Sequence, residues 1–227
     1  MPPVVVAVIP VLDEQDAIGR VLSEMPGMVS RRIVVDNGSR DRSADVARSH
    51  GAWVLHEPRR GYGQACLTGI AAAPDADVFV FLDGDYSDHP AQVVDVVAPI
   101  LAGQADLVVG SRRLGRNQPG AQPWHARAGT RACVTLMNLL AGTRATDLGP
   151  FRAIAAPALR RLEMRELTFG WTAEMQVKAA RRGLLTAEVP VDYRPRIGVS
   201  KISGTLSGSV RAGAGILGTI ARYSFGT

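Results

Sequence analysis

The chain has few cysteines and no long uncharged apolar run, and each absence excludes a class of protein. Its two cysteines, Cys66 and Cys133, lie far apart, so they match neither a zinc site nor a disulfide framework, and we expect buried free thiols. No uncharged apolar run approaches the roughly 20 residues needed to span a bilayer. The start, Met-Pro-Pro-Val, lacks the regions of a signal peptide. We therefore expect a cytoplasmic protein, soluble or peripheral on the inner face of the cell membrane.

Lysine is also scarce, and aromatic residues make up only 5% of the chain. Of 26 basic residues, only Lys178 and Lys201 are lysines, so arginine supplies nearly all the positive charge behind a formal net charge of +5. No basic stretch is interleaved with aromatic residues, which argues against nucleic acid as a partner. Arginine richness is compatible with phosphate ligands or an anionic membrane surface.

Apolar runs alternate with helical patterns over the first half of the chain. Strands are predicted over residues 4–9, 32–36, 53–56, 78–82 and 106–109, and helices over about 12–25, 43–50, 61–73 and 91–101. This alternation predicts an α/β fold with a doubly wound, mostly parallel sheet.

The rhythm of the sequence changes after residue 112. A Gly/Pro-rich loop over 114–124 precedes predicted helices over 125–140 and 170–182, a strand over 187–191 and a basic loop over 193–203. A glycine-rich helix over 205–225 ends the chain, and it is compatible with packing on the domain, on a second copy of the chain or on a membrane surface. Because no repeat or linker interrupts the chain, we expect one domain over residues 1–204, a C-terminal helix over 205–227, and a possible homo-oligomer.

Asp83-Gly84-Asp85 is the stretch around which the sequence is organised. It follows an apolar strand, and Pro90 is predicted to begin the next helix with Ser87 or Asp88 as its cap. The carboxyl end of a central strand is where open α/β sheets bind ligands. Clustered carboxylates repel one another unless a cation joins them, and Mg²⁺ or Mn²⁺ prefers carboxylates together with substrate phosphates. An isolated Asp-x-Asp is usually a solvated turn, but this position favours a metal site.

Six motifs in order resemble those of the family 2 glycosyltransferases, which have the GT-A fold. They are residues 8–14 (Val-Ile-Pro-Val-Leu-Asp-Glu), 35–39 (Val-Asp-Asn-Gly-Ser), 83–85 (Asp-Gly-Asp), 110–112 (Gly-Ser-Arg), 147–152 (Asp-Leu-Gly-Pro-Phe-Arg) and 196–201 (Arg-Ile-Gly-Val-Ser-Lys). The last two, with Glu174, resemble the branch of dolichyl- or polyprenyl-phosphate mannose or glucose synthases. The resemblance covers about residues 4–203.

The resemblance implies transfer of a hexose from a UDP- or GDP-sugar to a polyprenyl or dolichyl phosphate, with inversion and with Mg²⁺ or Mn²⁺. It places at the donor Pro10, Asp13, Glu14, Asp36, Arg60, Asp83 and Gly84, and on the metal Asp83 and Asp85. It places near the acceptor phosphate Arg112, Arg127, Arg131, Arg196, Ser200 and Lys201. Catalytic roles fall on Asp85, Asp147, Arg112 and Glu174.

The sequence departs from the pattern of this branch in two places. Three residues, rather than two, separate Asp85 from the following His-Pro pair, so a third metal ligand is left open between Ser87, Asp88 and neither. Arg59-Arg60 stands where the branch usually has a lysine before Gly61, and an arginine can still stack on a base or hold a phosphate.

Several predicted site residues also have plain structural interpretations. Asp36 could cap a turn, and Glu174 could pair with Lys178 one helical turn later. Arg127 and Arg131 lie four residues apart, as exposed charges on one helix face often do.

The acceptor is the least determined part of this reading. A phosphate acceptor is already anionic and needs arginines more than a base, whereas a hydroxyl acceptor would need a carboxylate base such as Asp147 or Glu174. A soluble hydroxyl acceptor and a non-catalytic nucleotide-sugar or lipid-binding module are therefore alternatives. A Rossmann dehydrogenase is disfavoured, because Pro-Val-Leu-Asp at 10–13 stands where Gly-x-Gly-x-x-Gly would follow the first strand.

Overall fold

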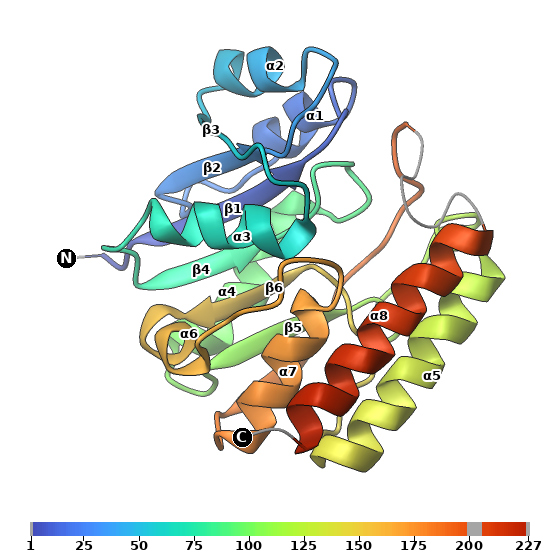
Figure 1. Ribbon diagram of the computed structural model, residues 1–227. Coiled ribbons are helices and arrows are strands. Elements are labelled where there is room, and N and C mark those ends of the chain that lie inside the picture. Colours follow the sequence, from blue (N-terminus) through green and yellow to red (C-terminus); the bar gives the residue numbers. More distant parts are fainter. Residues whose placement is uncertain (1, 199–205, 226–227) are drawn as a thin grey trace.

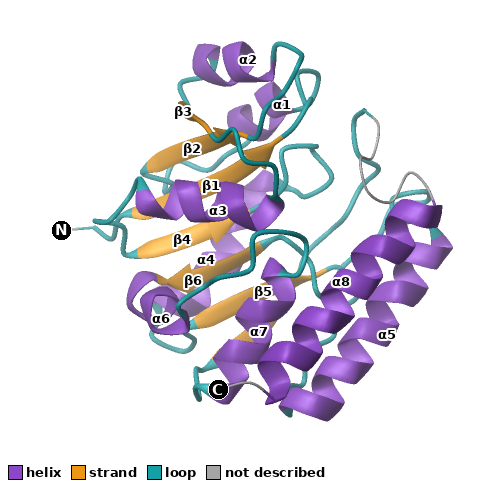
Figure 2. Ribbon diagram, in the orientation of Figure 1, coloured by secondary structure: helices purple, strands orange, loops and turns teal. Residues whose placement is uncertain are grey.

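One seven-stranded sheet, in the order β3-β2-β1-β4-β6-β5-β7, organises the chain (Figures 1 and 2). The computed structural model describes residues 2–198 and 206–225, with the side chains of the last helix from residue 212 onward. Its strands are β1 (Val5–Val11), β2 (Arg31–Asp36), β3 (Trp53–His56), β4 (Val78–Phe81), β5 (Leu107–Ser111), β6 (Arg152–Ala155) and β7 (Thr186–Pro190). Strands β3, β2, β1 and β4 are parallel, as are β5 and β7, whereas β6 is antiparallel to β4 and β5. The predicted mostly parallel α/β sheet is confirmed.

The central strand β1 is apolar on both faces because helices cover both faces of the sheet. Val8 pairs with Ile33 of β2 on one side and with Phe81 of β4 on the other, and all three are fully buried. A strand that is buried on both faces reads as a continuous β-branched run rather than as an alternating pattern. This burial explains why the strand was predictable from the sequence, and the parallel pairing of β1 with β4 places the carboxyl ends of both strands at one edge.

Helices form a layer on each face of the sheet (Figure 1). Buried residues of α1, α2 and α4 pack on one face, and those of α3, α6 and α7 pack on the other. The helices are α1 (Ile18–Ser23), α2 (Ser43–Ser49), α3 (Tyr62–Ala71), α4 (Val93–Leu101), α5 (Trp124–Ala141), α6 (Ala156–Leu162), α7 (Trp171–Arg181) and α8 (Leu206–Phe225), and a 3₁₀ turn covers Pro90–Gln92.

A third apolar cluster joins α5, α7 and α8 beside the sheet. It contains Cys133 and Met137 of α5, Val177 of α7 and Ile220 of α8, all of them buried. The last helix therefore packs on the domain, which is one of the three placements that the sequence left open. Across the described ranges, no helix combines the length and the apolarity needed to cross a bilayer.

The sequence analysis missed one helix, and its expectation of a helix cap was wrong. Helix α6 was not predicted, since it is short and begins with an Ala-Pro pair. Neither Ser87 nor Asp88 caps the helical turn at Pro90, because both side chains bond within the preceding loop. The Ser87 hydroxyl donates to Asp85 Oδ1 at 2.5 Å, and Asp88 Oδ2 accepts the amide of Asp83 at 3.3 Å.

Candidate functional site

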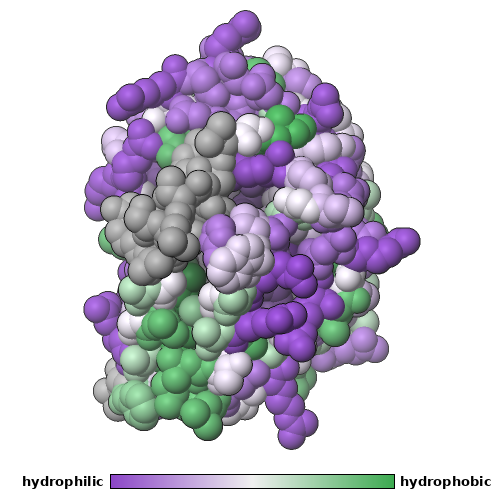
Figure 3. All heavy atoms as spheres, turned by 90° about the vertical axis from the view of Figure 1, so that its right-hand side faces the viewer, coloured by the Kyte–Doolittle hydropathy of each residue, from purple (hydrophilic) through white to green (hydrophobic). Residues whose placement is uncertain are grey.

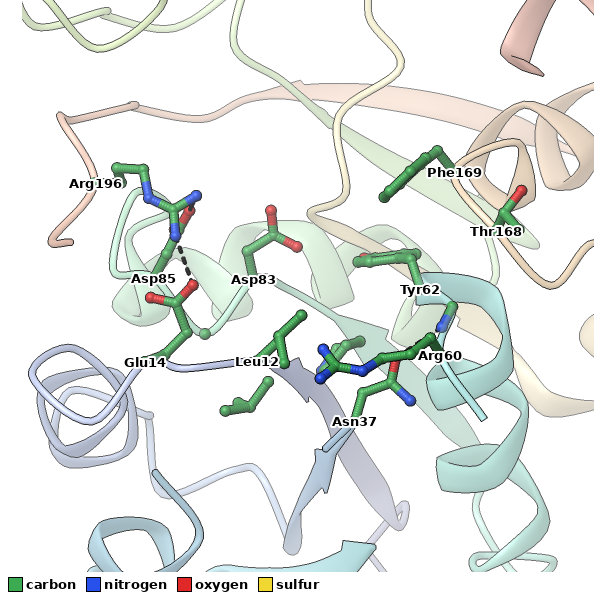
Figure 4. A pocket seen from close by; sticks show the side chains of 14 residues that line it. Leu12, Glu14, Asn37, Arg60, Tyr62, Asp83, Asp85, Thr168, Phe169 and Arg196 are labelled. Atoms are coloured by element: carbon green, nitrogen blue, oxygen red, sulfur yellow. Dashed lines mark hydrogen bonds and ion pairs between the residues drawn. The ribbon is translucent and has the colours of Figure 1, made fainter. Parts of the chain in front are cut away.

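A pocket of about 410 Å³ opens at the carboxyl ends of β1, β2 and β4. This is the edge at which open α/β sheets bind ligands. Figure 4 shows Glu14, Asp85 and Arg196 grouped at one end, and Tyr62, Thr168 and Phe169 at the other. The pocket is lined by Pro10, Val11, Leu12, Glu14, Asn37, Arg60, Gly61, Tyr62, Asp83, Gly84, Asp85, Thr168, Phe169 and Arg196.

Most of the residues predicted to bind the donor lie in this pocket. Pro10, Glu14, Arg60, Asp83 and Gly84 all line it. They come from three separate segments at the ends of β1, β3 and β4, and these parallel strands bring the segments to one edge of the sheet.

Two other predicted donor residues bond within the neighbouring turn and are not among the lining residues of the described pocket. Asp36 Oδ1 accepts the amide of Ser39 at 2.9 Å, and Asp13 Oδ1 accepts the amide of Arg40 at 2.7 Å. The turn-capping interpretation of Asp36 is therefore seen, and its contact with the donor base stays a prediction.

Asn37 is a pocket residue to which the sequence analysis gave no role. Its Nδ2 donates to the carbonyls of Glu57 and Arg59 at 3.0 and 2.7 Å, and its Oδ1 accepts the amide of Gly61 at 2.8 Å. These bonds fix the loop that carries Arg60 into the pocket. Its place directly after the predicted Asp36 was the available signal.

The residues at 163–170 form a loop that closes one end of the pocket with Thr168 and Phe169. A Cβ on Gly61 would lie 2.2 Å from the carbonyl oxygen of Leu167, and one on Gly63 would lie 2.1 Å from that of Glu166. Only glycine allows this approach, so these glycines before and within α3 seat the loop.

Glu174 holds the same loop from below. It is fully buried, and its two oxygens accept the amides of Arg165 and Glu166 at 2.9 and 2.8 Å. Lys178 Nζ lies 2.6 Å from Oε1, so the pairing expected one helical turn apart is present. These contacts occupy both oxygens. Glu174 is not among the described lining residues of the pocket, and it affects the pocket by fixing the position of the loop.

The acidic turn at residues 83–88 concentrates negative charge at the other end of the pocket. Burial, with Asp85 and Asp88 close by, raises the pKa of Asp83 well above its ordinary value. Burial and the charge of Asp85 raise the pKa of Asp88 to about 7. Asp88 is 1% exposed, and its Oδ1 has no hydrogen-bond partner among the described residues. A buried carboxylate oxygen without a donor is costly unless a cation or proton joins it.

These carboxylates fit a divalent cation that shares its coordination with a ligand. In the described part of the chain, no group of three or more His, Cys, Asp or Glu side chains could hold a metal by itself. Mg²⁺ commonly takes one or two carboxylates and completes its shell with phosphate oxygens and water. Asp83 and Asp85 both line the pocket, and the unpartnered Oδ1 of Asp88 lies in the same turn. These carboxylate ligands therefore match a metal that is bound together with a diphosphate.

Arg112 and Asp147 form a buried two-pronged ion pair behind the acidic turn. Arg112 Nε and Nη2 each lie 2.7 Å from a different oxygen of Asp147, and the amide of Arg112 adds a third bond at 3.0 Å. Burial favours the neutral carboxyl, but Arg112 outweighs it and keeps the pKa of Asp147 below its ordinary value. Neither residue is among the described lining residues of the pocket.

The predicted acceptor residues come from three parts of the chain: the end of β5 (Arg112), α5, and the segment after β7. Arg196 lines the pocket, and its guanidinium lies 3.2 Å from Asp85 Oδ2 and 2.5 Å from Glu14 Oε1. Arg127 and Arg131 are exposed on α5, and neither makes an ion pair with a described residue. Ser200 and Lys201 lie outside the described residues, so their predicted roles stay predictions.

Comparisons with known proteins agree on one family. The sequence matches the family model Glycosyl transferase family 2 over residues 6–163. It is 38% identical over 212 residues to an uncharacterized glycosyltransferase of Mycobacterium tuberculosis, which covers 92% of this chain and 94% of the relative. It is 33% identical over 202 residues to the dolichyl-phosphate hexose transferase of Haloferax volcanii, over 87% of this chain and 86% of the relative.

Solved structures agree on the fold. Glucosyl-3-phosphoglycerate synthase from Mycobacterium tuberculosis, in complex with Mn²⁺, UDP-glucose and phosphoglyceric acid, superimposes with a TM-score of 0.78 at 22% identity. The match covers 98% of this chain and 80% of that one. At this identity the likeness shows the GT-A fold alone. Together with the sequence matches, it establishes that the chain belongs to glycosyltransferase family 2 and is a glycosyltransferase.

Proposed function

We propose that the protein transfers a hexose from a nucleotide diphosphate sugar to a polyprenyl phosphate, with inversion and with a divalent cation. The observation that carries the proposal is the pocket at the sheet edge, with Asp83 and Asp85 at one end and Arg60 along its side. Solved relatives of the same fold contain Mn²⁺ and UDP-glucose, or Mg²⁺ and UDP. We infer that the same kind of donor binds here.

In this proposal the donor diphosphate lies beside the acidic turn. Asp83 and Asp85 hold the cation, which would neutralise the charge that develops on the leaving diphosphate. Arg60, whose Nη2 donates to the carbonyl of Gly38 at 2.9 Å, lies where it can contact the nucleotide. Asn37 and the 163–170 loop fix the end of the pocket opposite the acidic turn, where Arg60 and Tyr62 lie. Fixed groups of this kind stabilise the transition state because they need no reorganisation during the reaction.

The state of the carboxylates favours a phosphate over a hydroxyl as the acceptor. A hydroxyl must lose a proton to a base during attack. Both oxygens of Asp147 accept hydrogen bonds from Arg112, and both oxygens of Glu174 accept backbone amides, with Lys178 also in contact. Neither candidate base therefore has a carboxylate oxygen without a partner that could accept a proton from a hydroxyl acceptor. A phosphate oxygen is already anionic. It would form the new bond to the anomeric carbon as the bond to the diphosphate oxygen breaks, and the electron pair would leave with the nucleoside diphosphate.

The outer face of α5 supports a lipid carrier for that phosphate. Trp124 and Leu139 are 79% and 78% exposed, and Arg127 and Arg131 lie between them on the same exposed face. Apolar residues gather on the side of the molecule that carries α5 and α8 (Figure 3). Exposed apolar residues mixed with arginines are typical of helices that lie on an anionic membrane surface. The Haloferax relative is named a dolichyl-phosphate hexose transferase, which agrees with this acceptor.

A soluble acceptor is the second candidate, because the structural neighbour binds phosphoglyceric acid. The two are separated by offering UDP- and GDP-sugars with Mn²⁺ or Mg²⁺, with a short polyprenyl phosphate, with phosphoglyceric acid or with an alcohol. We expect glycosyl transfer to the polyprenyl phosphate. Product that appears only with the soluble acceptors would overturn the lipid proposal.

The metal assignment is tested by Asp85→Asn in the same assay. We expect a loss of at least about 1000-fold in kcat/KM, since the metal and its carboxylates act on the charge of the transition state. Asp95→Asn, an exposed aspartate on α4, is the matched control and should keep full activity. Retained activity in Asp85→Asn, with an unchanged circular dichroism spectrum, would contradict the assignment.

A further inference from the structure

Arg196 bridges two acidic residues of the pocket that come from distant parts of the chain. Its Nη1 lies 3.2 Å from Asp85 Oδ2, and its Nη2 lies 2.5 Å from Glu14 Oε1. The side chain of Arg196 is 25% exposed, and each carboxylate is 9% exposed. Figure 4 shows the guanidinium at the end of the pocket, between the loop after β1 and the acidic turn. Arg196 therefore neutralises the charge at the place where the proposed function puts a divalent cation.

The oxygen that Arg196 contacts is the one that a cation would use. Asp85 Oδ1 already accepts the amide of Ser87 at 2.9 Å and its hydroxyl at 2.5 Å. Oδ2 is left facing the pocket, and Arg196 lies against it. Two cations at one carboxylate oxygen repel each other, and the repulsion is strong where burial lowers the effective dielectric constant. Arginine and metal are thus competitors for Oδ2.

The segment that carries Arg196 is attached along the acidic turn. The amide of Arg194 donates to the carbonyl of Ser87, and the amide of Ile197 donates to that of Asp85, both at 3.0 Å. The guanidinium of Arg194 lies 3.2 Å from the centre of the Tyr86 ring, and its Nε donates to the carbonyl of Tyr86 at 2.6 Å. We call residues 193–198 the strap. Its backbone follows the turn, so a change at Asp85 acts directly on Ile197.

We propose that Arg196 is an exchangeable counter-ion of the metal site, which pairs with Asp85 and Glu14 until a divalent cation displaces it. The proposal rests on the assignment of the metal to Asp85 in the proposed function. Displacement frees the guanidinium of Arg196, which then presents donors suited to a phosphate group. Loading of the donor with its cation is thereby coupled to the strap, and the acceptor phosphate meets a free arginine only after the donor is in place.

The test is a titration with Mn²⁺ alone, and again with inorganic pyrophosphate, followed by electron paramagnetic resonance of free Mn²⁺. Removing the competitor in Arg196→Gln should tighten Mn²⁺ binding about tenfold, which corresponds to about 1.4 kcal/mol. Arg196→Lys keeps the charge but replaces the rigid planar fork of donors with a single ammonium group, so its Mn²⁺ affinity should fall between those of the wild type and Arg196→Gln.

Arg60→Gln is the matched control for charge. It removes one positive charge from the same pocket, but the described hydrogen bond of Arg60 goes to the carbonyl of Gly38. A general electrostatic effect at that exposed position is screened, and in the titration with Mn²⁺ alone we expect a change in Mn²⁺ affinity of about twofold or less. Equal tightening in Arg60→Gln and Arg196→Gln would overturn the proposal, as would unchanged Mn²⁺ affinity in Arg196→Gln.

Hydrogen exchange of the strap gives a second readout that does not depend on turnover. Mn²⁺ with pyrophosphate should raise the exchange rate of the Ile197 amide in the wild-type protein, whereas in Arg196→Gln the rate should be high from the start. An Ile197 amide that Mn²⁺ leaves unchanged in the wild type would contradict the coupling. Mn²⁺ affinity that is the same in Asp85→Asn as in the wild type would refute the metal assignment itself, and the inference with it.

Discussion

The region around the sheet and the layer formed by α5 and α8 differ in how tightly their glycines are packed. Near the sheet, a Cβ on Gly63 would lie 2.1 Å from the carbonyl oxygen of Glu166. In α8, a Cβ on Gly213, Gly215 or Gly218 would meet no described heavy atom within 4 Å. Glycine costs stability inside a helix, so it is explained by a contact in the first region and by no described contact in the second.

The difference separates the region where we propose that the donor binds from the region where we propose that the acceptor binds. Around the pocket, the side chains of Glu57 and Asn37 each make several hydrogen bonds, one of them from the Gly61 amide to Asn37, and a preorganised nucleotide site requires such fixed groups. The outer faces of α5 and α8 carry exposed apolar residues such as Trp124 and Phe225. A surface of this kind suits a large or fluid partner better than a small ligand. The buried pair of Arg112 and Asp147 lies where the two regions join.

The largest effect is expected from breaking that junction with Asp147→Asn. The change leaves the buried guanidinium of Arg112 without its counter-ion, and removal of one partner from a buried pair typically costs about 3–5 kcal/mol. We expect a loss of about 3 kcal/mol in the free energy of unfolding, measured by urea denaturation. The control is Asp192→Asn, whose partner Arg116 is 92% exposed, so the loss should stay below about 1 kcal/mol. Similar losses in both variants would contradict a greater stabilising role for the buried Arg112 pair.

The fixed side of the comparison was largely predictable from the sequence. The family resemblance assigned Pro10, Glu14, Asp83 and Asp85 to the donor and its metal, and the structure brings them to one pocket because the parallel strands β1 and β4 end at one edge. Local pattern supported that assignment, since Pro10 lies in β1 and the other three residues lie two to four positions beyond a buried strand.

What the sequence did not predict depends on contacts between distant segments. Arg112 and Asp147 were each singled out, but nothing local indicates that they bind each other. Glu174 was assigned to catalysis, whereas the structure places it beneath the 163–170 loop. Arg196 was assigned to the acceptor, and its contacts with Asp85 and Glu14 follow from the path of the strap along the acidic turn. Side-chain pairing across the fold is set by tertiary packing, which has no period in the sequence.

A second prediction, Glu57→Gln, tests how much the hydrogen bonds around the pocket contribute to stability. Hydrogen bonds from the Thr68 hydroxyl, the Arg59 amide and the Gln64 amide lower the pKa of Glu57 from 4.5 to about 2. Bonds to a charged acceptor contribute about 1.5–3 kcal/mol each, so we expect Glu57→Gln to lose about 2 kcal/mol of unfolding free energy at pH 7.

The pH dependence gives this prediction its sign. A carboxyl whose pKa is lowered by folding stabilises the protein fully above pH 4.5, and the contribution is lost as the pH falls toward 2. The difference between wild type and Glu57→Gln should therefore shrink between pH 4.5 and pH 2, as measured by urea denaturation across that range. A difference that is the same at pH 7 and pH 3 would show that shape, rather than charge, is what Glu57 contributes. Glu163→Gln, at an exposed position, should show neither effect.

The smallest of these effects on stability, and the only increase, is expected from Gly218→Ala in α8. The new methyl group would meet no described heavy atom within 4 Å, and alanine is favoured over glycine in a helix by about 0.5–1 kcal/mol, so the melting temperature should rise. Gly63→Ala is the same substitution in α3, but it should lower the melting temperature, because the new Cβ would collide with the carbonyl oxygen of Glu166. Calorimetry of both variants measures the contrast. If Gly218→Ala instead lowers the melting temperature and shifts the protein to a smaller species in size-exclusion chromatography, then a second copy of the chain covers this face of α8, and its glycines are interface residues.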